Sequence, residues 1–222
     1  MRNLLFMKKN VMLILGIVPL FVMSCAHVEK TYYPNGSLES EAGYFGGKMN
    51  GTAVWYYENG SIRMQVEYEK GRLNGACVRY YRNGKPEVRC GYSNDTLDGE
   101  YLHYDEEGWL SERLLYRMGV KNGQYRCYHD GEQLKIEGYY ADDQFDGEWK
   151  YYDDQGFVIG MGHFVKGKGV LEYLDDNNRV RRRVSYENSL KNGPESFFDE
   201  DGLEYRTMFY ENNRLIRIGQ ND

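Results

Sequence analysis

A glycine that recurs every 24 residues is the feature that most constrains how this chain can fold. It is found at Gly51, Gly75, Gly99, Gly123 and Gly147. One spacing of 22 residues follows, and the 24-residue phase resumes between Gly169 and Gly193. A fixed period of about 20–50 residues is typical of repeat proteins, in which each unit packs on its neighbours. Counting back from Gly51 puts a first unit at His27, so eight units run from there to about residue 216.

Each unit has the pattern of a strand, a tight turn and a second strand. A turn such as Glu58-Asn59-Gly60 follows the first strand, and Asn-Gly pairs accept the positive φ angles of hairpin turns. An Asn or Asp before the opening glycine, as at Asn74, predicts another turn between units. The second strand alternates with period two. In the second unit this alternation predicts one buried face, consisting of Ile62, Met64, Val66 and Tyr68.

These patterns predict an all-β fold, an elongated and twisted meander of about eight β-hairpin repeats and about sixteen strands. We expect residues 27–217 to form the array and residues 218–222 to form a C-terminal tail. Open sheets rarely exceed about ten strands without curling, so curvature is expected. The sixth unit is two residues short, and it has few bulky side chains because it contains Gly160, Gly162, Gly167 and Gly169. These features predict a kink there.

The N-terminus has the features of an export signal. Three basic residues precede an apolar run over residues 11–23, which is too short to span a bilayer comfortably. The run ends in Val22-Met23-Ser24-Cys25, which resembles a bacterial lipobox. The resemblance implies a lipoprotein signal peptide over residues 1–24 and a lipidated N-terminus at residues 25–26. An ordinary signal peptide or a membrane-anchoring helix is the alternative.

From this signal we expect an exported protein held in the cell envelope by lipid on Cys25. Stable anchoring needs more than one acyl chain, and bacterial lipoproteins resemble that case. Ala26 is not an inner-membrane retention signal by the enterobacterial rule, so the expected location is the outer membrane. Exposure on the periplasmic or the outer side stays open, as does a start at Met1 or at Met7.

The charge balance argues against nucleic acid as a partner. The whole chain has 28 Lys and Arg against 34 Asp and Glu. Residues 1–24 contain three of these cations and no acid, so the mature chain has 25 against 34 and a net charge of −9. Binding to phosphate backbones requires clusters of Lys and Arg. Aromatic residues make up 15% of the chain, including 22 Tyr, which suits strands better than helices.

The pattern Gly-x-Trp-x-Tyr-Tyr-x-x-x-Gly, best kept over residues 147–156, resembles the MORN repeat in its bacterial variant form. The resemblance covers about 190 residues and implies hairpin units stacked into an elongated sheet. It also implies scaffolding, partner binding or, for some eukaryotic members, membrane association. Bacterial chains of this variant are often grouped as an antitoxin-type family. An exported lipoprotein fits an immunity role outside the cytoplasm better than a cytoplasmic antitoxin. The family brings no catalytic residues.

A row of tyrosines is the candidate binding surface. They recur at the sixth position of the first strand and at the last position of the second strand. The predicted face consists of Tyr56, Tyr68, Tyr80, Tyr92, Tyr104, Tyr116, Tyr128 and Tyr140. Aromatic rings could stack on sugars or on peptide prolines. The alternative is that these rings are simply the core of a thin sheet.

Other chemistry is weakly represented. Cys77 and Cys90 fall in the two strands of one unit, and either a disulfide or two buried free thiols fit an exported chain. No two of the four histidines have the spacing of metal ligands. Neither a nucleophile elbow nor a glycine-rich phosphate loop is present. We therefore expect no catalytic residues, no metal site and no cofactor.

Taken together, the sequence predicts a non-enzymatic, lipid-anchored repeat protein that acts as a protein-binding scaffold in the cell envelope. The expected partner is a protein of unknown identity, with contact to the membrane through the lipid on Cys25 and none to nucleic acid. Two alternatives remain open. One is a module that binds glycans of the cell envelope, and the other is an immunity or antitoxin-like partner of a toxin.

Overall fold

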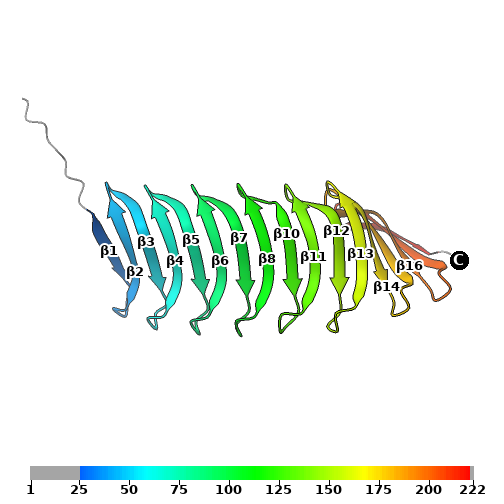
Figure 1. Ribbon diagram of the computed structural model, residues 1–222, viewed down its shortest axis with the longest axis horizontal. Helices are drawn as coiled ribbons and strands as arrows, with labels where there is room; N and C mark the ends of the chain where they lie inside the picture. Colours follow the sequence, from blue (N-terminus) through cyan, green and yellow to red (C-terminus); the bar gives the residue numbers. More distant parts are fainter. Residues whose placement is uncertain (1–25, 221–222) are drawn as a thin grey trace, which may run out of the picture.

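The computed structural model describes residues 26–220, which form 18 β-strands and no helix. Consecutive strands pair antiparallel along the run (Figure 1), except that β9 and β10 both pair with β8 instead of with each other. The predicted all-β meander of hairpins is confirmed. The strands are β1 (His27–Tyr32), β2 (Leu38–Phe45), β3 (Lys48–Tyr56), β4 (Ile62–Glu69), β5 (Arg72–Tyr80), β6 (Pro86–Ser93), β7 (Thr96–Tyr104), β8 (Leu110–Arg117), β9 (Val120–Lys121), β10 (Gly123–Tyr128), β11 (Leu134–Ala141), β12 (Gln144–Tyr152), β13 (Val158–Val165), β14 (Lys168–Leu174), β15 (Val180–Glu187), β16 (Leu190–Phe198), β17 (Glu204–Glu211) and β18 (Arg214–Gln220).

The hairpin turns use the glycines that the sequence indicated. Between β3 and β4, the N–H of Gly60 donates to the carbonyl of Tyr57 at 2.8 Å, and Gly60 has a φ of 85°. Glycine adopts this left-handed conformation without steric cost. The side-chain oxygen of Asn59 accepts the N–H of Ser61 at 3.0 Å and fixes the turn from inside.

Cross-strand pairing divides the side chains between two faces of the sheet. Ala53 pairs with Val66, and both are almost fully buried. Their side, which we call the core face, also carries Tyr68 opposite Gly51. The other side, which we call the outer face, carries neighbours such as Val54 in the alternating pattern of a strand.

A β-bulge within each hairpin changes which residues share a face. In the second unit Trp55 pairs with Met64 and Tyr56 pairs with Ile62, so Arg63 is an extra residue on β4. The bulge places Ile62 on the outer face, where it is 37% exposed. The prediction that Ile62 shares the buried face with Met64 is therefore wrong, because the extra residue reverses the alternation.

A larger bulge joins five of the hairpins to the next one. Between β4 and β5, Val66 pairs with Cys77 and Tyr68 pairs with Leu73. Three residues of β5, numbers 74–76, therefore lie opposite the single residue Glu67 of β4. Gly75 is the middle residue of the three and has a φ of 120°. The same register shift recurs at β2–β3, β6–β7, β11–β12 and β15–β16. The recurring glycine of the sequence is thus the middle residue of the bulge at four of these junctions, and at β11–β12 Gly147 is the first of the three residues.

The junction between β13 and β14 has no such bulge. Phe164 pairs with Gly169 and Val165 pairs with Lys168, in continuous register. This junction is the place where the glycine spacing falls from 24 to 22 residues. The two residues that are missing here are those that form the bulge elsewhere.

Hydrogen bonds tie the first four units to one another at both edges of the sheet. At one edge a tyrosine hydroxyl donates to a backbone carbonyl of the next unit at 2.7 Å, from Tyr33, Tyr57 and Tyr81. At the other edge the N–H of Gly71 donates to the carbonyl of Met49 at 2.8 Å. Beside it, the side chain of Asn50 accepts the N–H of Lys70 at 3.2 Å. Neighbouring units are therefore aligned at both ends.

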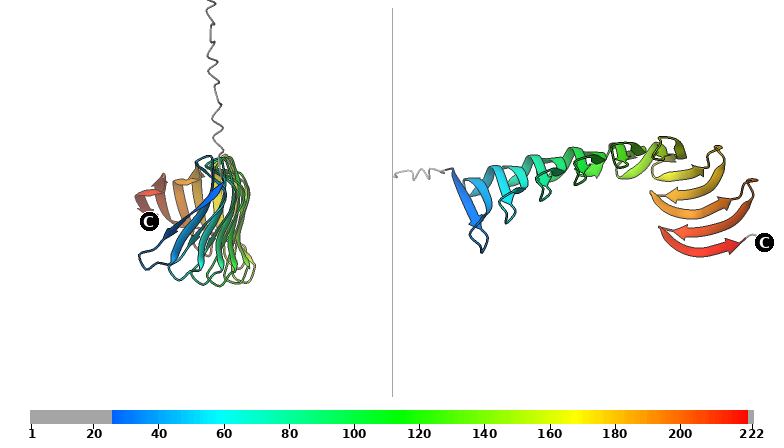
Figure 2. Two further views of the ribbon diagram at one scale, coloured as in Figure 1. Left: turned by 90° about the vertical axis from the view of Figure 1, so that its left-hand side faces the viewer. Right: turned by 90° about the horizontal axis from the view of Figure 1, so that it is seen from below.

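The array bends in the sixth and seventh units, as predicted. Figure 2 shows the run of strands changing direction where the chain colour passes from yellow to orange. Phe145 on β12 and Tyr186 on β15 are three strand spacings apart, about 14 Å on a flat sheet. Their ring centroids are nevertheless only 6.0 Å apart, so the sheet curls toward the core face. The N–H of Phe145 also donates to the Oγ of Ser189 at 2.7 Å.

Glycines make room for the large rings at the core of this bend. A Cβ on Gly138 would lie 2.2 Å from the ring of Trp149, and a Cβ on Gly162 would lie 2.9 Å from the ring of Phe164. Trp149, Phe164 and Leu171 are buried there together. Glycine is required at these positions for space, whereas the hairpin glycines are required for backbone conformation.

The number of strands differs from the prediction of about sixteen for two reasons. β9 and β10 form one strand of the repeat that is interrupted at Asn122, whose N–H donates to the carbonyl of Leu115 at 2.9 Å. In addition, β18 follows the eighth hairpin and pairs with β17. The array therefore continues to Gln220, three residues beyond its expected end at residue 217.

Candidate partner-binding groove on the outer face

The eight tyrosines of the predicted face lie on two opposite faces. Tyr68 is on the core face, and Tyr92, Tyr116 and Tyr140 hold the equivalent position opposite a glycine. Tyr56 is on the outer face with its equivalents Tyr80, Tyr104 and Tyr128, because each follows a core-face residue directly in its strand. The single tyrosine surface is therefore corrected to two half-buried rows.

The two rows have different surroundings. On the outer face, the hydroxyl of Tyr56 donates to the carboxylate of Glu41 at 2.9 Å. On the core face, burial raises the pKa of Tyr68, and it raises the pKa of Tyr140 to about 12. The core-face row thus serves in large part as packing, in agreement with the alternative that the sequence left open.

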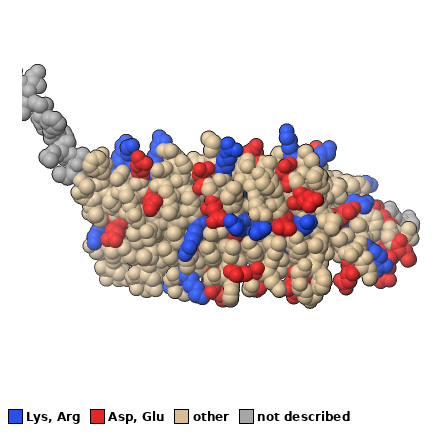
Figure 3. Space-filling view, in the orientation of Figure 1, with Lys and Arg blue, Asp and Glu red and all other residues tan. Residues whose placement is uncertain are grey.

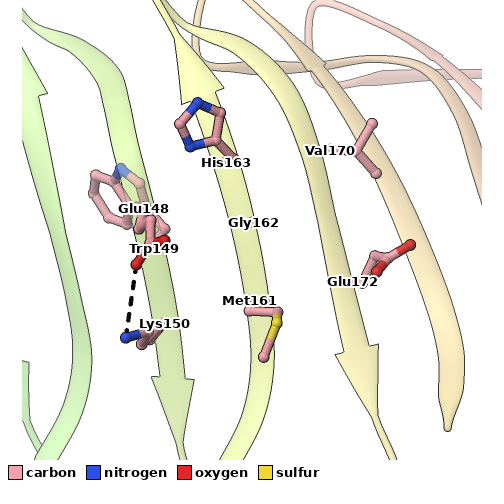
Figure 4. Close-up of a pocket in the computed structure, with 8 residues that line it drawn as sticks. All are labelled: Glu148, Trp149, Lys150, Met161, Gly162, His163, Val170 and Glu172. Atoms are coloured by element: carbon pink, nitrogen blue, oxygen red, sulfur yellow. Dashed lines mark ion pairs between the residues drawn. The ribbon is translucent and has the colours of Figure 1, made fainter.

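A groove on the outer face crosses strands β10 to β14. Its first part is a depression of about 290 Å³, drawn in Figure 4 and lined by Glu148, Trp149, Lys150, Met161, Gly162, His163, Val170 and Glu172. Its second part has about 340 Å³ and is lined by Gln124, Glu137, Gly138, Tyr139, Glu148 and Lys150. The two parts share Glu148 and Lys150, and we call them together the outer groove.

The outer groove combines exposed apolar side chains with charges of both signs. Tyr139 and Met161 are each 44% exposed and Val170 is 39% exposed. Lys150 lies 3.7 Å from Glu148, the ion pair drawn in Figure 4. Figure 3 shows basic and acidic side chains side by side across the middle of one face. Apolar contact area with a polar surround is the usual composition of a protein-binding surface.

Sequence reasoning missed the groove, although a signal for it exists. Met161 pairs with Glu172 and His163 pairs with Val170, so these residues occupy the outer positions of their strands. In a one-layer sheet with one solvated face, outer positions are expected to be polar. An apolar residue at an outer position, as at Met161 and Val170, departs from that rule. Recognising this signal requires knowing which residues pair across the sheet, because the pairing decides which positions are on the outer face.

The cysteines of the third unit lie directly opposite each other. Cys77 pairs with Cys90 on the core face, and both are half-buried free thiols. A hydrogen bond between the two sulfurs lowers the pKa of Cys77 and raises the pKa of Cys90. The register that the sequence could not decide is thus the one that brings the two thiols together.

No metal site is found within residues 26–220, where three or more His, Cys, Asp or Glu side chains do not converge. The same residues contain no helix long and apolar enough to cross a membrane. The predicted signal peptide at residues 1–24 and the lipid site at Cys25 lie outside the described residues.

Comparison with known families identifies the repeat. Four successive segments match the family model described as MORN repeat variant, over residues 28–45, 49–70, 73–94 and 97–118. Over these four segments, within residues 28–118, the chain is similar to the MORN repeat variant. These MORN segments correspond to the first four hairpins, and the later units continue the same meander with one altered junction.

Comparison with individual proteins adds little. No curated protein matches the chain. Among solved structures, a crystal structure of TcdB2-TccC3-TEV matches with a TM-score of 0.24 and 11% sequence identity. The match covers 82% of this chain but only 12% of that one.

Proposed function

We propose that this MORN-repeat protein is a non-enzymatic scaffold, anchored in the cell envelope by lipid on Cys25, that binds a protein partner in the outer groove. The observation that carries the proposal is the exposure of Tyr139, Met161 and Val170 on a face that alternation would make polar. Beside the groove, hydrogen bonds from the ring of His129 to the carbonyl of Tyr152 and from the N–H of Gly167 to the carbonyl of Phe145 link neighbouring units and hold this part of the sheet in a fixed arrangement. Binding to a pre-organised surface costs little ordering entropy.

An affinity capture with matched variants tests the groove. The bait is tagged protein of residues 26–222, incubated with envelope extract and analysed by mass spectrometry. We expect one protein in stoichiometric amount with the parent bait, and its loss with Met161→Glu, since a charge in the apolar part of the groove opposes burial. Ile62→Glu places the same charge on the outer face far from the groove, and it should retain the partner. Equal capture by Met161→Glu would refute the groove as the binding surface.

The lipid anchor is tested separately. Cys25→Ala removes the proposed lipid site, so the protein should move from the membrane fraction to the soluble fraction after export. Recovery of the variant in the membrane fraction, still resistant to salt, would contradict anchoring by lipid.

A glycan is the alternative ligand that the exposed ring of Tyr139 would suit, because aromatic rings stack on sugars. Retention of the parent protein on a peptidoglycan or polysaccharide column, and loss of retention in Tyr139→Ala, would favour that alternative over a protein partner.

A further inference from the structure

The core face of the last units carries basic side chains between aromatic rings. Tyr173 on β14 pairs with Arg182 on β15, Arg182 pairs with Phe197 on β16, and Phe197 pairs with Arg206 on β17. Four neighbouring strands therefore present an alternating row of ring, guanidinium, ring and guanidinium on one face. We call these residues, with Lys191 and Glu195, the basic-aromatic cluster.

Stacking holds the two guanidinium groups in place. Arg182 lies 4.8 Å from the ring centroid of Tyr173 and 5.8 Å from that of Phe197. Arg206 lies 4.3 Å from the centroid of Phe197, on the next strand. A cation within about 6 Å of a ring centroid is attracted by the ring, and an arginine held in this way keeps its hydrogen-bonding edge available.

The charges of the basic-aromatic cluster do not balance. Glu195 is only 2% exposed and accepts hydrogen bonds from Arg182 at 2.5 Å and Lys191 at 3.0 Å. Burial opposes ionisation of Glu195, but the hydrogen bond from Lys191 and the charge of Arg182 outweigh it, so the pKa of Glu195 lies below its usual value. One carboxylate thus faces three cations.

Arg206 is the cation of the cluster whose hydrogen bonding is incomplete. Its Nε atom is buried and has no hydrogen-bond partner within residues 26–220. Buried polar atoms in native proteins are nearly always satisfied, so an unpaired guanidinium nitrogen needs an explanation. An anionic group bound beside Arg206 would compensate the charge of its guanidinium group.

We propose that the basic-aromatic cluster binds an acidic segment of a protein partner, an extended peptide with at least two carboxylates. Arginine pairs well with carboxylates, often through two parallel hydrogen bonds. The three cations span β15 to β17, about 10 Å, which is more than a single carboxylate can contact. The net charge of −6 on the whole chain disfavours nucleic acid, a far denser polyanion.

This site is distinct from the outer groove, because it lies on the opposite face of the sheet and the two have only strand β14 in common. The two proposals can therefore fail separately. Loss of capture in Met161→Glu concerns the groove, whereas the experiment below concerns the cluster alone.

Binding of a fluorescent hexaglutamate peptide, followed by anisotropy with protein of residues 26–222, tests the proposal. At about 50 mM salt we expect saturable binding that weakens strongly at about 500 mM salt, where charges are screened. Arg206→Gln and Lys191→Gln should each weaken binding by about tenfold, the usual effect of losing one charged hydrogen bond. Circular dichroism checks that each variant is folded. If one variant does not fold, the other still tests the proposal.

Arg126→Gln is the matched control, because Arg126 also has a buried Nε without a partner but pairs with Glu137 on the outer face. It should bind the peptide as the parent protein does. Unchanged binding in both folded cluster variants, or an equal loss in Arg126→Gln, would overturn the proposal. Displacement of the peptide by an equal concentration of pyrophosphate would also overturn it and assign the cluster to a phosphate anion.

Discussion

The junctions β4–β5 and β13–β14 join hairpins of the same kind but give the array different shapes. At β4–β5 three residues face one, with Gly75 at the centre of the bulge. At β13–β14 the register is continuous, and the array bends there (Figure 2). A bulge increases the local twist of a strand pair. Two residues at one junction therefore decide whether the next unit continues the run of strands or turns away from it.

The two regions also differ in how they fill the core face. The first units bury small residues such as Ala53 and Val66, with half-buried rings around them. The bend buries Trp149 and Phe164 against neighbouring glycines such as Gly138 and Gly162. Curling brings rings from distant strands into contact, so this region has a core that a flat single-layer sheet cannot form.

The largest effect is expected from restoring the missing bulge. Insertion of Leu-Asn between Lys168 and Gly169 recreates the pattern of Gly71-Arg72-Leu73-Asn74-Gly75. The array should straighten, and small-angle X-ray scattering should show a larger radius of gyration and maximum dimension. The same dipeptide inserted in the hairpin turn between Asp154 and Gln155 is the control and should leave both values almost unchanged. An unchanged scattering profile after the junction insertion would show that the bulge does not set the shape.

A large loss of stability is expected from Gly138→Ala. The new Cβ would lie 2.2 Å from the ring of buried Trp149, so the indole must move away from its packed position. Overpacking of this kind costs about 1–3 kcal/mol of unfolding free energy, or more where nothing can shift. Urea unfolding followed by Trp fluorescence measures it. Gly219→Ala is the matched control, because its Cβ would meet no atom closer than 3.6 Å; equal stability losses would contradict the argument.

An intermediate effect is expected at alkaline pH. Burial raises the pKa of Tyr186 to about 12, above its ordinary value of 10.0. Because the folded state holds this tyrosine neutral, its contribution to stability is complete below pH 10 and is lost as the pH rises to about 12. Tyr186→Phe should therefore lose less unfolding free energy between pH 9 and 12 than the parent protein.

Exposed Tyr139 provides the comparison for that measurement. Tyr139→Phe should follow the alkaline decline of the parent protein. A parallel decline in Tyr186→Phe would mean that this ring does not couple folding to pH.

The smallest effect is expected from the cross-unit hydrogen bonds. Tyr57→Phe removes the hydroxyl that donates to the carbonyl of Tyr80 at 2.7 Å. The loss should be about 1 kcal/mol of unfolding free energy, the net value of one such hydrogen bond. Tyr32→Phe, whose ring is 60% exposed, serves as the control. Equal thermal unfolding of the two variants would show that the tyrosine hydrogen bonds between units do not stabilise the array.

Local patterns in the sequence were enough to predict the repeat, its hairpins and the position of the bend. Gly60 and Gly75 mark places where the backbone adopts a positive φ, a requirement that depends only on neighbouring residues. The shortened spacing before Gly169 marked the altered junction in the same way. Such signals are local and can be read without knowing which strands meet.

The register of the sheet was decided only by the tertiary structure. Bulges moved Ile62 to the outer face, placed Tyr56 and Tyr68 on opposite sides and brought Cys77 opposite Cys90. The outer groove and the basic-aromatic cluster likewise combine residues from several units. The physical reason is that a single extra residue reverses the face of every side chain beyond it, and the sum of such shifts is set by pairing between strands rather than by any one segment.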